Sequence, residues 1–171
     1  MNSRQQGLIL FNTLMMISVL SLIVLSQMQL IFVQLKATNL VLFRHQSFQR
    51  LENEANRLVL AGRKEWPQEC LISEANPNAI IERLKGKKGC TVFNDDQHYK
   101  FLVEDLGFFP CLQTTRNFML YSTRHWRLTI TAVMEKPITL QLRIARAAEY
   151  MPCVSNQTIS INTGIISWRS I

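Results

Sequence analysis

The chain begins with a long apolar tract. Residues Leu8 to Val33 form 26 positions without a charge, and no charged residue occurs between Arg4 and Lys36. A helix needs about 20 apolar residues to cross a bilayer. A cleavable secretory signal usually has a shorter apolar stretch of about 7–15 residues that ends at small residues, and this tract does not fit that pattern. The tract therefore predicts a membrane-spanning helix over 8–35.

Uncharged polar residues interrupt this tract. They are tolerated in a spanning helix, and at contacts between helices they can form hydrogen bonds across the interface. Both interpretations stay open here. The residues are Asn12, Thr13, Ser18, Ser21, Ser26, Gln27 and Gln29.

Charges at the two ends of the tract predict its orientation. Arg4 precedes the tract, so the positive-inside rule holds the short leader in the cytoplasm and places the C-terminal part on the other side of the membrane. Lys36, just beyond the tract, opposes this orientation weakly.

The helical pattern continues past the apolar tract. Between Leu8 and Arg63 there is no proline, and the first strong breakers are Gly62 and the Trp66-Pro67 pair. A single helix over this range would be about 84 Å long at 1.5 Å per residue. Its second half carries one apolar stripe opposite a polar face, which predicts packing on a folded domain. The stripe consists of Phe48, Leu51, Ala55 and Leu58.

The sequence from Trp66 to Thr115 is irregular. Only Ala79 to Leu84 and Tyr99 to Val103 have the pattern of short regular elements. Turns are expected at several breakers, among them Asn94 to Asp96 and Gly107 to Pro110.

Beyond this region the apolar period changes to two, which is typical of strands. The two alternating runs predict an antiparallel hairpin with its turn at Glu135 to Pro137. Its apolar face is the expected partner of the helix stripe, since each surface alone would be left in water. Further strands are possible at 118–121 and at 159–161 or 165–168. The alternating apolar positions are Trp126, Leu128, Ile130, Ala132 and Met134, then Ile138, Leu140, Leu142 and Ile144.

Four cysteines lie beyond the apolar tract, and an even count in an exported domain indicates disulfides with three possible connectivities. We favour Cys70 with Cys90 and Cys111 with Cys153, because each bond would close an irregular region instead of crossing the hairpin. A zinc site lacks support, since there is no C-x-x-C pair and no histidine close in sequence to a cysteine. A catalytic thiol, Cys111 or Cys153 with His125, is a weaker alternative.

Charge adds one candidate binding site. The 171 residues contain 19 Lys and Arg against 12 Asp and Glu, a formal net charge of +7 that favours anionic partners without choosing among them. Lys85, Lys87 and Lys88 lie between glycines and could bind DNA or a surface polymer. Such a run is more often a solvated turn, so nucleic acid is an alternative partner here.

No motif in the chain indicates catalysis. Nucleophile elbows, phosphate-binding glycine loops, H-E-x-x-H and paired carboxylates with a catalytic pattern are missing from the sequence. His45 falls on the long helix, and we expect His98 and His125 to face solvent or lie on an edge strand. The acidic pairs Asp95-Asp96 and Glu104-Asp105 are expected beside turns. We therefore expect no enzyme, no cofactor and no metal.

The residues at the start of the chain resemble the class III signal of type IV prepilins. The leader from Met1 to Gly7 reads MNSRQQG, and Leu8 to Phe11 follow at once as LILF. The resemblance implies that a prepilin peptidase cuts after Gly7 and methylates the new N-terminus at Leu8. It also implies that the helix, with Phe11 and Asn12 near its start, serves first as a membrane anchor and later as the packed centre of a filament.

Four segments are similar to a PilX-type minor pilin, namely 48–55, 99–107, 126–132 and 166–169. One departure from the wider family matters. Major pilins carry glutamate at the fifth mature position, where it is thought to meet the N-terminal ammonium of a neighbouring subunit, and this position is Asn12 here. An amide cannot neutralise that charge, so the resemblance favours a subunit at the tip of a fibre over one in its shaft.

The resemblance implies an α+β, pilin-like fold in which a long helix packs on a small antiparallel sheet. The parts are a leader (1–7), a transmembrane and filament-core helix (8–35), an amphipathic helix half (36–65) and a periplasmic head (66–171). The implied function is that of a minor pilin in type IV pilus assembly, anchored in the bacterial inner membrane and then incorporated at or near the pilus tip. Implied partners are the prepilin peptidase, other minor pilins and the major pilin. A minor pseudopilin of a type II secretion system is the alternative.

Overall fold

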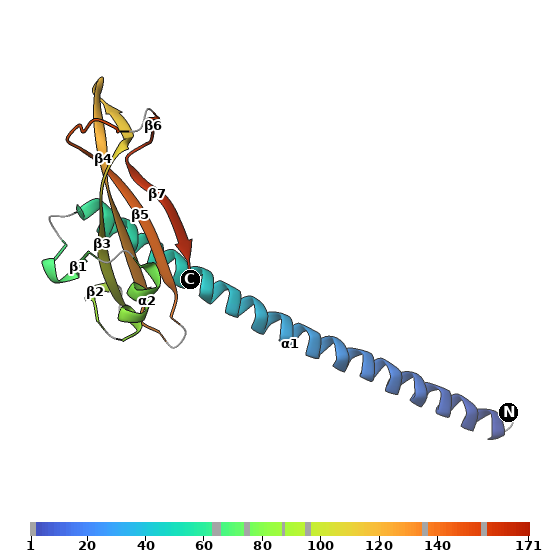
Figure 1. The fold of residues 1–171 in the computed structure, drawn as a ribbon. Helices are drawn as coiled ribbons and strands as arrows, with labels where there is room; N and C mark the ends of the chain where they lie inside the picture. The colour runs from blue at the N-terminus through green and yellow to red at the C-terminus, as the bar shows by residue number, and fades with distance from the viewer. Residues whose placement is uncertain are drawn as a thin grey trace. The chain divides into compact units, whose positions relative to one another are not determined.

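The computed structural model describes residues 3–62, 66–73, 76–86, 88–94, 97–134, 137–154 and 157–171. The chain divides into two compact units, Met1–Ser47 and Phe48–Ile171, and each is described by itself. Helix α1 (Ser3–Ala61) makes up the described part of the first unit and continues into the second (Figure 1). The long uninterrupted helix expected from the sequence is therefore confirmed.

Helix α1 ends where the sequence places a breaker. Gly62 has a φ of +72°, a left-handed conformation that favours glycine. A Cβ atom at this position would lie 2.5 Å from the Arg146 guanidinium. The glycine thus both stops the helix and leaves room for an arginine from the sheet.

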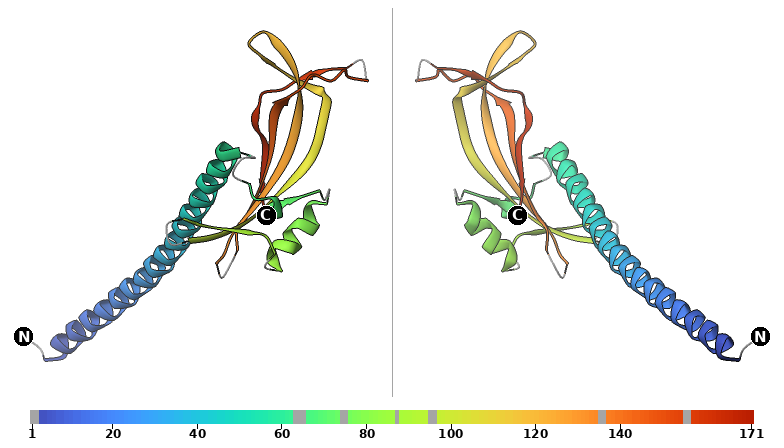
Figure 2. Two further views of the ribbon diagram at one scale, coloured as in Figure 1. Left: turned by 90° about the vertical axis from the view of Figure 1, so that its left-hand side faces the viewer. Right: turned by 90° about the vertical axis from the view of Figure 1, so that its right-hand side faces the viewer.

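The second unit is built on a mixed, mostly antiparallel sheet in the order β1-β3-β4-β5-β7, with β2 and β6 also paired to β3 (Figures 1 and 2). The structure is thus α+β, as expected. A short 3-10 helix, η2 (Gln68–Cys70), precedes the first strand, and helix α2 (Pro77–Lys85) lies between β1 and β2. The strands are β1 (Leu71–Ile72), β2 (Cys90–Asn94), β3 (Gln97–Arg116), β4 (Met119–Ala132), β5 (Thr139–Ala148), β6 (Ile159–Ser160) and β7 (Gly164–Ser170).

The predicted hairpin is confirmed and forms the centre of the sheet. Strands β4 and β5 are antiparallel, with Leu128 opposite Leu142 and Ile130 opposite Leu140. Both strands are longer than the alternating runs, because β4 begins at Met119 and β5 ends at Ala148. The predicted turn residues Glu135 and Lys136 lie outside the described residues.

The C-terminal part of α1 packs on one face of this sheet through the predicted stripe. Leu51, Ala55 and Leu58 are buried, and Phe48 lies partly buried beside them. Burying a leucine side chain contributes about 1.5–3 kcal/mol, so this stripe is a main source of stability. From the sheet, the same core includes Tyr99, Phe101, Val103, Trp126, Leu128, Ile130, Ala132, Leu140, Leu142 and Ile144.

Helix α2 packs against the opposite face of the sheet. Ile80 and Leu84 of α2 form a second core cluster with Leu102 of β3. The side chain of Asn76 caps the helix by accepting a hydrogen bond of 3.0 Å from the backbone N–H of Asn78. The second core helps to explain why polar residues of the hairpin, such as Thr129, are buried rather than exposed.

Strand β3 corrects two expectations. The sequence predicts a short element at Tyr99 to Val103 and a turn at Gly107 to Pro110, but β3 runs for 20 residues through both. The glycine and proline are absorbed by register shifts between Asp105 and Gly107 and between Phe109 and Gln113. Gly107 has a φ of +86°, which is typical of such an irregularity.

The neighbouring elements also differ in part from the expectation. Strand β2 (Cys90–Asn94) has no counterpart in the prediction, and it pairs antiparallel with the start of β3. The expected segment at 118–121 belongs to β4 from Met119 onward, while Phe118 lies in the preceding turn with a φ of 62°. Of the two C-terminal alternatives, the structure contains both, as β6 and β7.

Candidate assembly helix and binding surfaces of the head

The first part of α1 exposes an apolar surface. Every residue from Ile9 to Gln46 is exposed, including Phe11 at 71%. Within the described chain, one helix, over Ile9–Ala61, is long and apolar enough to cross a membrane by length and composition. This surface therefore fits a single-pass membrane anchor.

The candidate processing and assembly residues lie near the start of this helix. The backbone of Gly7 and Leu8 is helical, and nothing is described of the Leu8 side chain. Several hydroxyl groups in the apolar tract donate to carbonyl oxygens of the same helix, for example Thr13 to Leu10 at 2.9 Å. Asn12 forms no such bond to any described residue.

Both disulfides form with the pairing favoured from the sequence. Cys70 is bonded to Cys90 with the Cα atoms 5.6 Å apart, and Cys111 to Cys153 with the Cα atoms 4.7 Å apart. The first joins the η2 region to strand β2, and the second joins β3 to the loop before β6. No cysteine in the described residues is free, so the catalytic-thiol alternative has no thiol to use.

The lysine-rich segment begins at the C-terminal end of α2. Lys85 lies at the end of α2 and donates to Glu82 at 2.9 Å, so its charge is paired. Lys88 is exposed, with its backbone N–H bonded to the Arg83 carbonyl. Lys87 lies outside the described residues. Lys85 and Lys88 are thus both exposed to solvent.

His125 is the clearest correction among the candidate residues. We expected an exposed or edge position, but His125 lies in the central strand β4 and is fully buried. Arg143 Nε donates to His125 Nδ1 at 3.1 Å, so the other ring nitrogen, Nε2, carries the proton. Nε2 donates to Thr123 Oγ1 at 3.0 Å, and this hydroxyl donates to the Leu112 carbonyl at 2.7 Å. The neutral ring therefore links strands β3, β4 and β5.

The surroundings of His125 oppose its protonation. Burial, followed by the nearby Arg143 charge, lowers the pKa of His125 from 6.5 to about 4. Phe109 stacks on the ring with the centroids 4.3 Å apart. The histidine is thus a neutral structural group at neutral pH.

Two acidic groups expected beside turns are instead paired within strands. Glu104 and Asp105 lie in β3, where Glu104 accepts from Arg127 at 2.9 Å and Asp105 pairs with Arg124. Asp95 and Asp96 lie outside the described residues. Both carboxylates thus pair with arginines of β4.

A buried carboxylate also lies within the helix stripe. Glu54 is only 1% exposed, between the apolar positions Leu51 and Leu58. It accepts hydrogen bonds from Arg57 at 2.5–3.1 Å on its own helix and from the Asn94 amide of β2 at 2.9 Å. These bonds compensate the loss of water around the charge.

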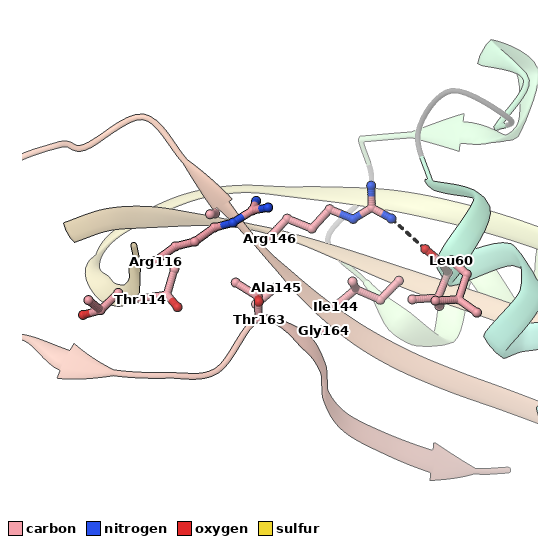
Figure 3. A pocket seen from close by; sticks show the side chains of 11 residues that line it. Leu60, Thr114, Arg116, Ile144, Ala145, Arg146, Thr163 and Gly164 are labelled. Atoms are coloured by element: carbon pink, nitrogen blue, oxygen red, sulfur yellow. Dashed lines mark hydrogen bonds between the residues drawn. The ribbon is translucent and has the colours of Figure 1, made fainter. Parts of the chain in front are cut away.

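An open groove of about 590 Å³ lies beyond the end of α1 (Figure 3). Arg146 extends from β5 along this groove, and its Nη2 donates to the Val59 carbonyl at 2.6 Å. The guanidinium also lies over the rings of Trp66 and Trp126, with distances of 5.6 and 6.0 Å to the ring centroids. Arg146 therefore ties the last turn of α1 to the sheet and is occupied by this structural role.

A second cavity of about 380 Å³ is lined by three arginines that sequence analysis missed: Arg127, Arg143 and Arg169. Arg127 of β4 is directly opposite Arg143 of β5, and Arg169 lies on β7 opposite Gln141. In the alternating pattern of the hairpin, the first two lie opposite the apolar positions. Their gathering depends on β7 pairing beside β5, which no local pattern reveals.

The described residues contain no group of three or more His, Cys, Asp or Glu side chains placed to hold a metal ion. Fold and surfaces together define an α+β head built onto a single long apolar helix of the membrane-anchor type. Comparison with protein-family models, with curated proteins and with solved structures found no match to this chain.

Proposed function

We propose that this protein is a minor pilin that takes part in type IV pilus assembly as a priming or tip subunit. The observation that carries the proposal is the continuous helix α1, whose residues from Ile9 to Gln46 expose an apolar surface while its last turns form part of the core of the head. One such element can leave a bilayer and pack among other helices without a change in its own structure. The role is one of structure and interaction.

The proposal includes an anchor in the inner membrane with the head in the periplasm. The position of Arg4 before the apolar tract supports this orientation by the positive-inside rule. The two disulfides support it independently, because disulfides persist in oxidising compartments such as the periplasm. After assembly the head lies at or near the tip of the pilus.

Asn12 supports the tip position. In a shaft, the ammonium of each neighbouring subunit needs a carboxylate to compensate its charge in an apolar environment. Asn12 offers only an amide, which can donate and accept hydrogen bonds but carries no charge. Replacing it with glutamate (Asn12→Glu) should increase the share of subunits found along the shaft, as counted by immunogold labelling of sheared pili.

Processing tests the proposal directly. On co-expression with a prepilin peptidase, the chain should lose residues Met1 to Gly7 and gain one methyl group on Leu8, as measured by mass spectrometry of the intact protein. Gly7→Ala should block both changes, and Gln6→Ala, one residue away, should leave them intact. An uncut chain, or one cut beyond the apolar tract, contradicts the assignment.

The alternative within this class is a minor pseudopilin of a type II secretion system. The two roles differ in the machine that takes up the subunit. Restoring pili in a strain without its minor pilins supports the pilus assignment, whereas restoring protein secretion without pili assigns the chain to the secretion system.

A further inference from the structure

The cavity lined by Arg127, Arg143 and Arg169, on the α2 side of the sheet, has side chains suited to bind oxyanions. Arg143 donates through Nε to His125 at 3.1 Å, and Arg169 donates through Nε to the Gln141 side-chain oxygen at 2.8 Å. Each of these two side chains is thereby held by its inner nitrogen. The outer Nη groups of both donate no hydrogen bond to a described residue, and the Arg143 guanidinium lies 5.0 Å from the centroid of the Phe109 ring. A guanidinium binds a carboxylate best through two parallel N–H groups.

The same cavity has an excess of positive charge. Among its lining residues and their partners, Arg127 is paired with Glu104, while Arg143 and Arg169 are held by neutral groups. Like charges directly opposite each other on a sheet are destabilising, and Arg127 lies directly opposite Arg143. A ligand that brings negative charge would relieve this repulsion.

The cavity borders an open strand edge. Strand β7 pairs with β5 on one side, and no described strand pairs with its other side. Thr139 and Ile171 exchange hydrogen bonds of 2.9 and 3.4 Å, which fixes the alternation along the pair. By that alternation the N–H and C=O groups of Trp168 and Ser170 point away from β5, toward the open side.

The two observations call for the same occupant. We propose that the open edge of β7 binds an extended acidic segment of a partner protein as an added strand, with carboxylates of that segment on Arg143 and Arg169. Such a segment provides hydrogen-bond partners both for the outward-facing backbone groups of the edge and for the Nη groups of Arg143 and Arg169. It also places alternate side chains on the Arg169 face of the sheet, as the period of a strand requires.

The spacing allows both arginines to be reached. A side chain of the added strand opposite Arg169 is its direct neighbour, at the usual strand separation of about 4.8 Å. Arg143 lies one strand further from the added strand, on β5. The β7 residue that lies between the added strand and Arg143 is Ser167, which is small and directly opposite Arg143. A glutamate side chain can therefore extend over Ser167 to meet the long side chain of Arg143.

Other occupants fit less well. A second copy of this chain paired through β7 would bring one Arg169 close to another, on a protein with a net charge of +7. Nucleic acid offers phosphates but no backbone amides for the open edge. The large exposed ring on β7, Trp168, lies on the opposite face of the sheet, in contact with Phe48, so it cannot stack a base beside the arginines.

The test uses the full chain in uncharged detergent micelles and a synthetic peptide that alternates valine and glutamate, with blocked ends and a fluorescent label. Binding is measured by fluorescence anisotropy at low and high salt. Control peptides replace glutamate with lysine, or carry N-methyl groups on alternate residues to remove one row of backbone hydrogen bonds. Duplex DNA of similar charge serves as a phosphate control.

The variants separate the two contacts. Arg169→Gln removes an exposed guanidinium together with its side-chain bond to Gln141. Ser170→Pro removes an N–H that does not bond to β5, so both variants keep the backbone hydrogen bonds between the two strands. The matched control Arg116→Gln removes an exposed arginine from the other groove. Loss of a charged hydrogen bond should weaken binding of the acidic peptide roughly tenfold or more for Arg169→Gln. Ser170→Pro should weaken it similarly, and Arg116→Gln should leave it unchanged.

Specific outcomes overturn the inference. If Arg169→Gln and Arg116→Gln weaken binding of the acidic peptide equally, the binding depends on the net charge of the protein and not on this cavity. Undiminished binding of the N-methylated peptide excludes strand addition, and tighter binding of DNA than of the acidic peptide assigns the surface to nucleic acid. The inference does not rest on the pilus assignment, because peptide binding is measured on the chain alone, without peptidase processing.

Discussion

The buried histidine makes a quantitative prediction about acid stability. His125 is neutral in the folded protein because burial and Arg143 lower its pKa from 6.5 to about 4. A tenfold change in proton affinity is worth about 1.4 kcal/mol, so protonating the folded protein costs about 3 kcal/mol more than protonating the unfolded chain. The histidine is then a donor at both nitrogens, and it faces the donor Arg143 Nε instead of accepting from it.

The sign of the effect follows from proton binding. Because the pKa is lower in the folded state, the unfolded state binds the additional proton as the pH falls. The contribution of His125 to the free energy of unfolding is therefore complete above pH 6.5, and it decreases as the pH falls from 6.5 to about 4. Below that range it is lost.

The assay is unfolding of the head by urea in the full chain held in uncharged micelles, followed by the fluorescence of the buried Trp66 and Trp126. His125→Gln keeps one acceptor and one donor but does not titrate, so its free energy of unfolding should fall less with acid than that of the original chain. The difference between the two slopes should approach about 3 kcal/mol over the range. His98→Gln, at an exposed position, should retain the full slope. Identical slopes for His125→Gln and the original chain would refute the reasoning.

Two further predictions concern packing and covalent links in the head. Leu51→Ala should lower the free energy of unfolding by about 2–5 kcal/mol, because it opens a cavity at a fully buried position, while Leu60→Ala, at a position 86% exposed, should have almost no effect in the same urea titration. Replacing the bonded pair Cys70 and Cys90 with serines should cost about 3 kcal/mol for the loop of 20 residues, and equal urea midpoints for the two proteins would contradict this estimate.

The sequence predicted the parts of the fold that depend on a clear apolar period. The helix α1, its stripe at Leu51 and Leu58, and the central hairpin all follow from periods of 3.6 or 2 that buried neighbours impose. The full length of strand β3 was not predicted, because Gly107 and Pro110 are as typical of an irregular strand as of a turn. Only the pairing of β3 with β4 along both sides of the irregularity decides between them.

The surfaces of the head were harder to predict than its core. The three lysines at 85–88 form the most conspicuous charge run, yet Lys85 is paired with Glu82. Arg127, Arg143 and Arg169 are separated in the chain and become neighbours only through strand register. His125 was misjudged for a related reason, because a polar residue on an alternating strand is read as exposed, whereas here irregular residues of β3 cover it.

The buried Glu54 has a consequence for how α1 seats on the sheet. The apolar positions Leu51, Ala55 and Leu58 recur about once per turn, so a shift of the helix by one turn would exchange similar side chains and alter the apolar contact only moderately. The same shift would carry the carboxylate away from the Asn94 amide and leave it short of a partner in a dry environment. We therefore expect Glu54 to fix the axial position of α1 on the sheet, because only one position places its carboxylate beside the Asn94 amide.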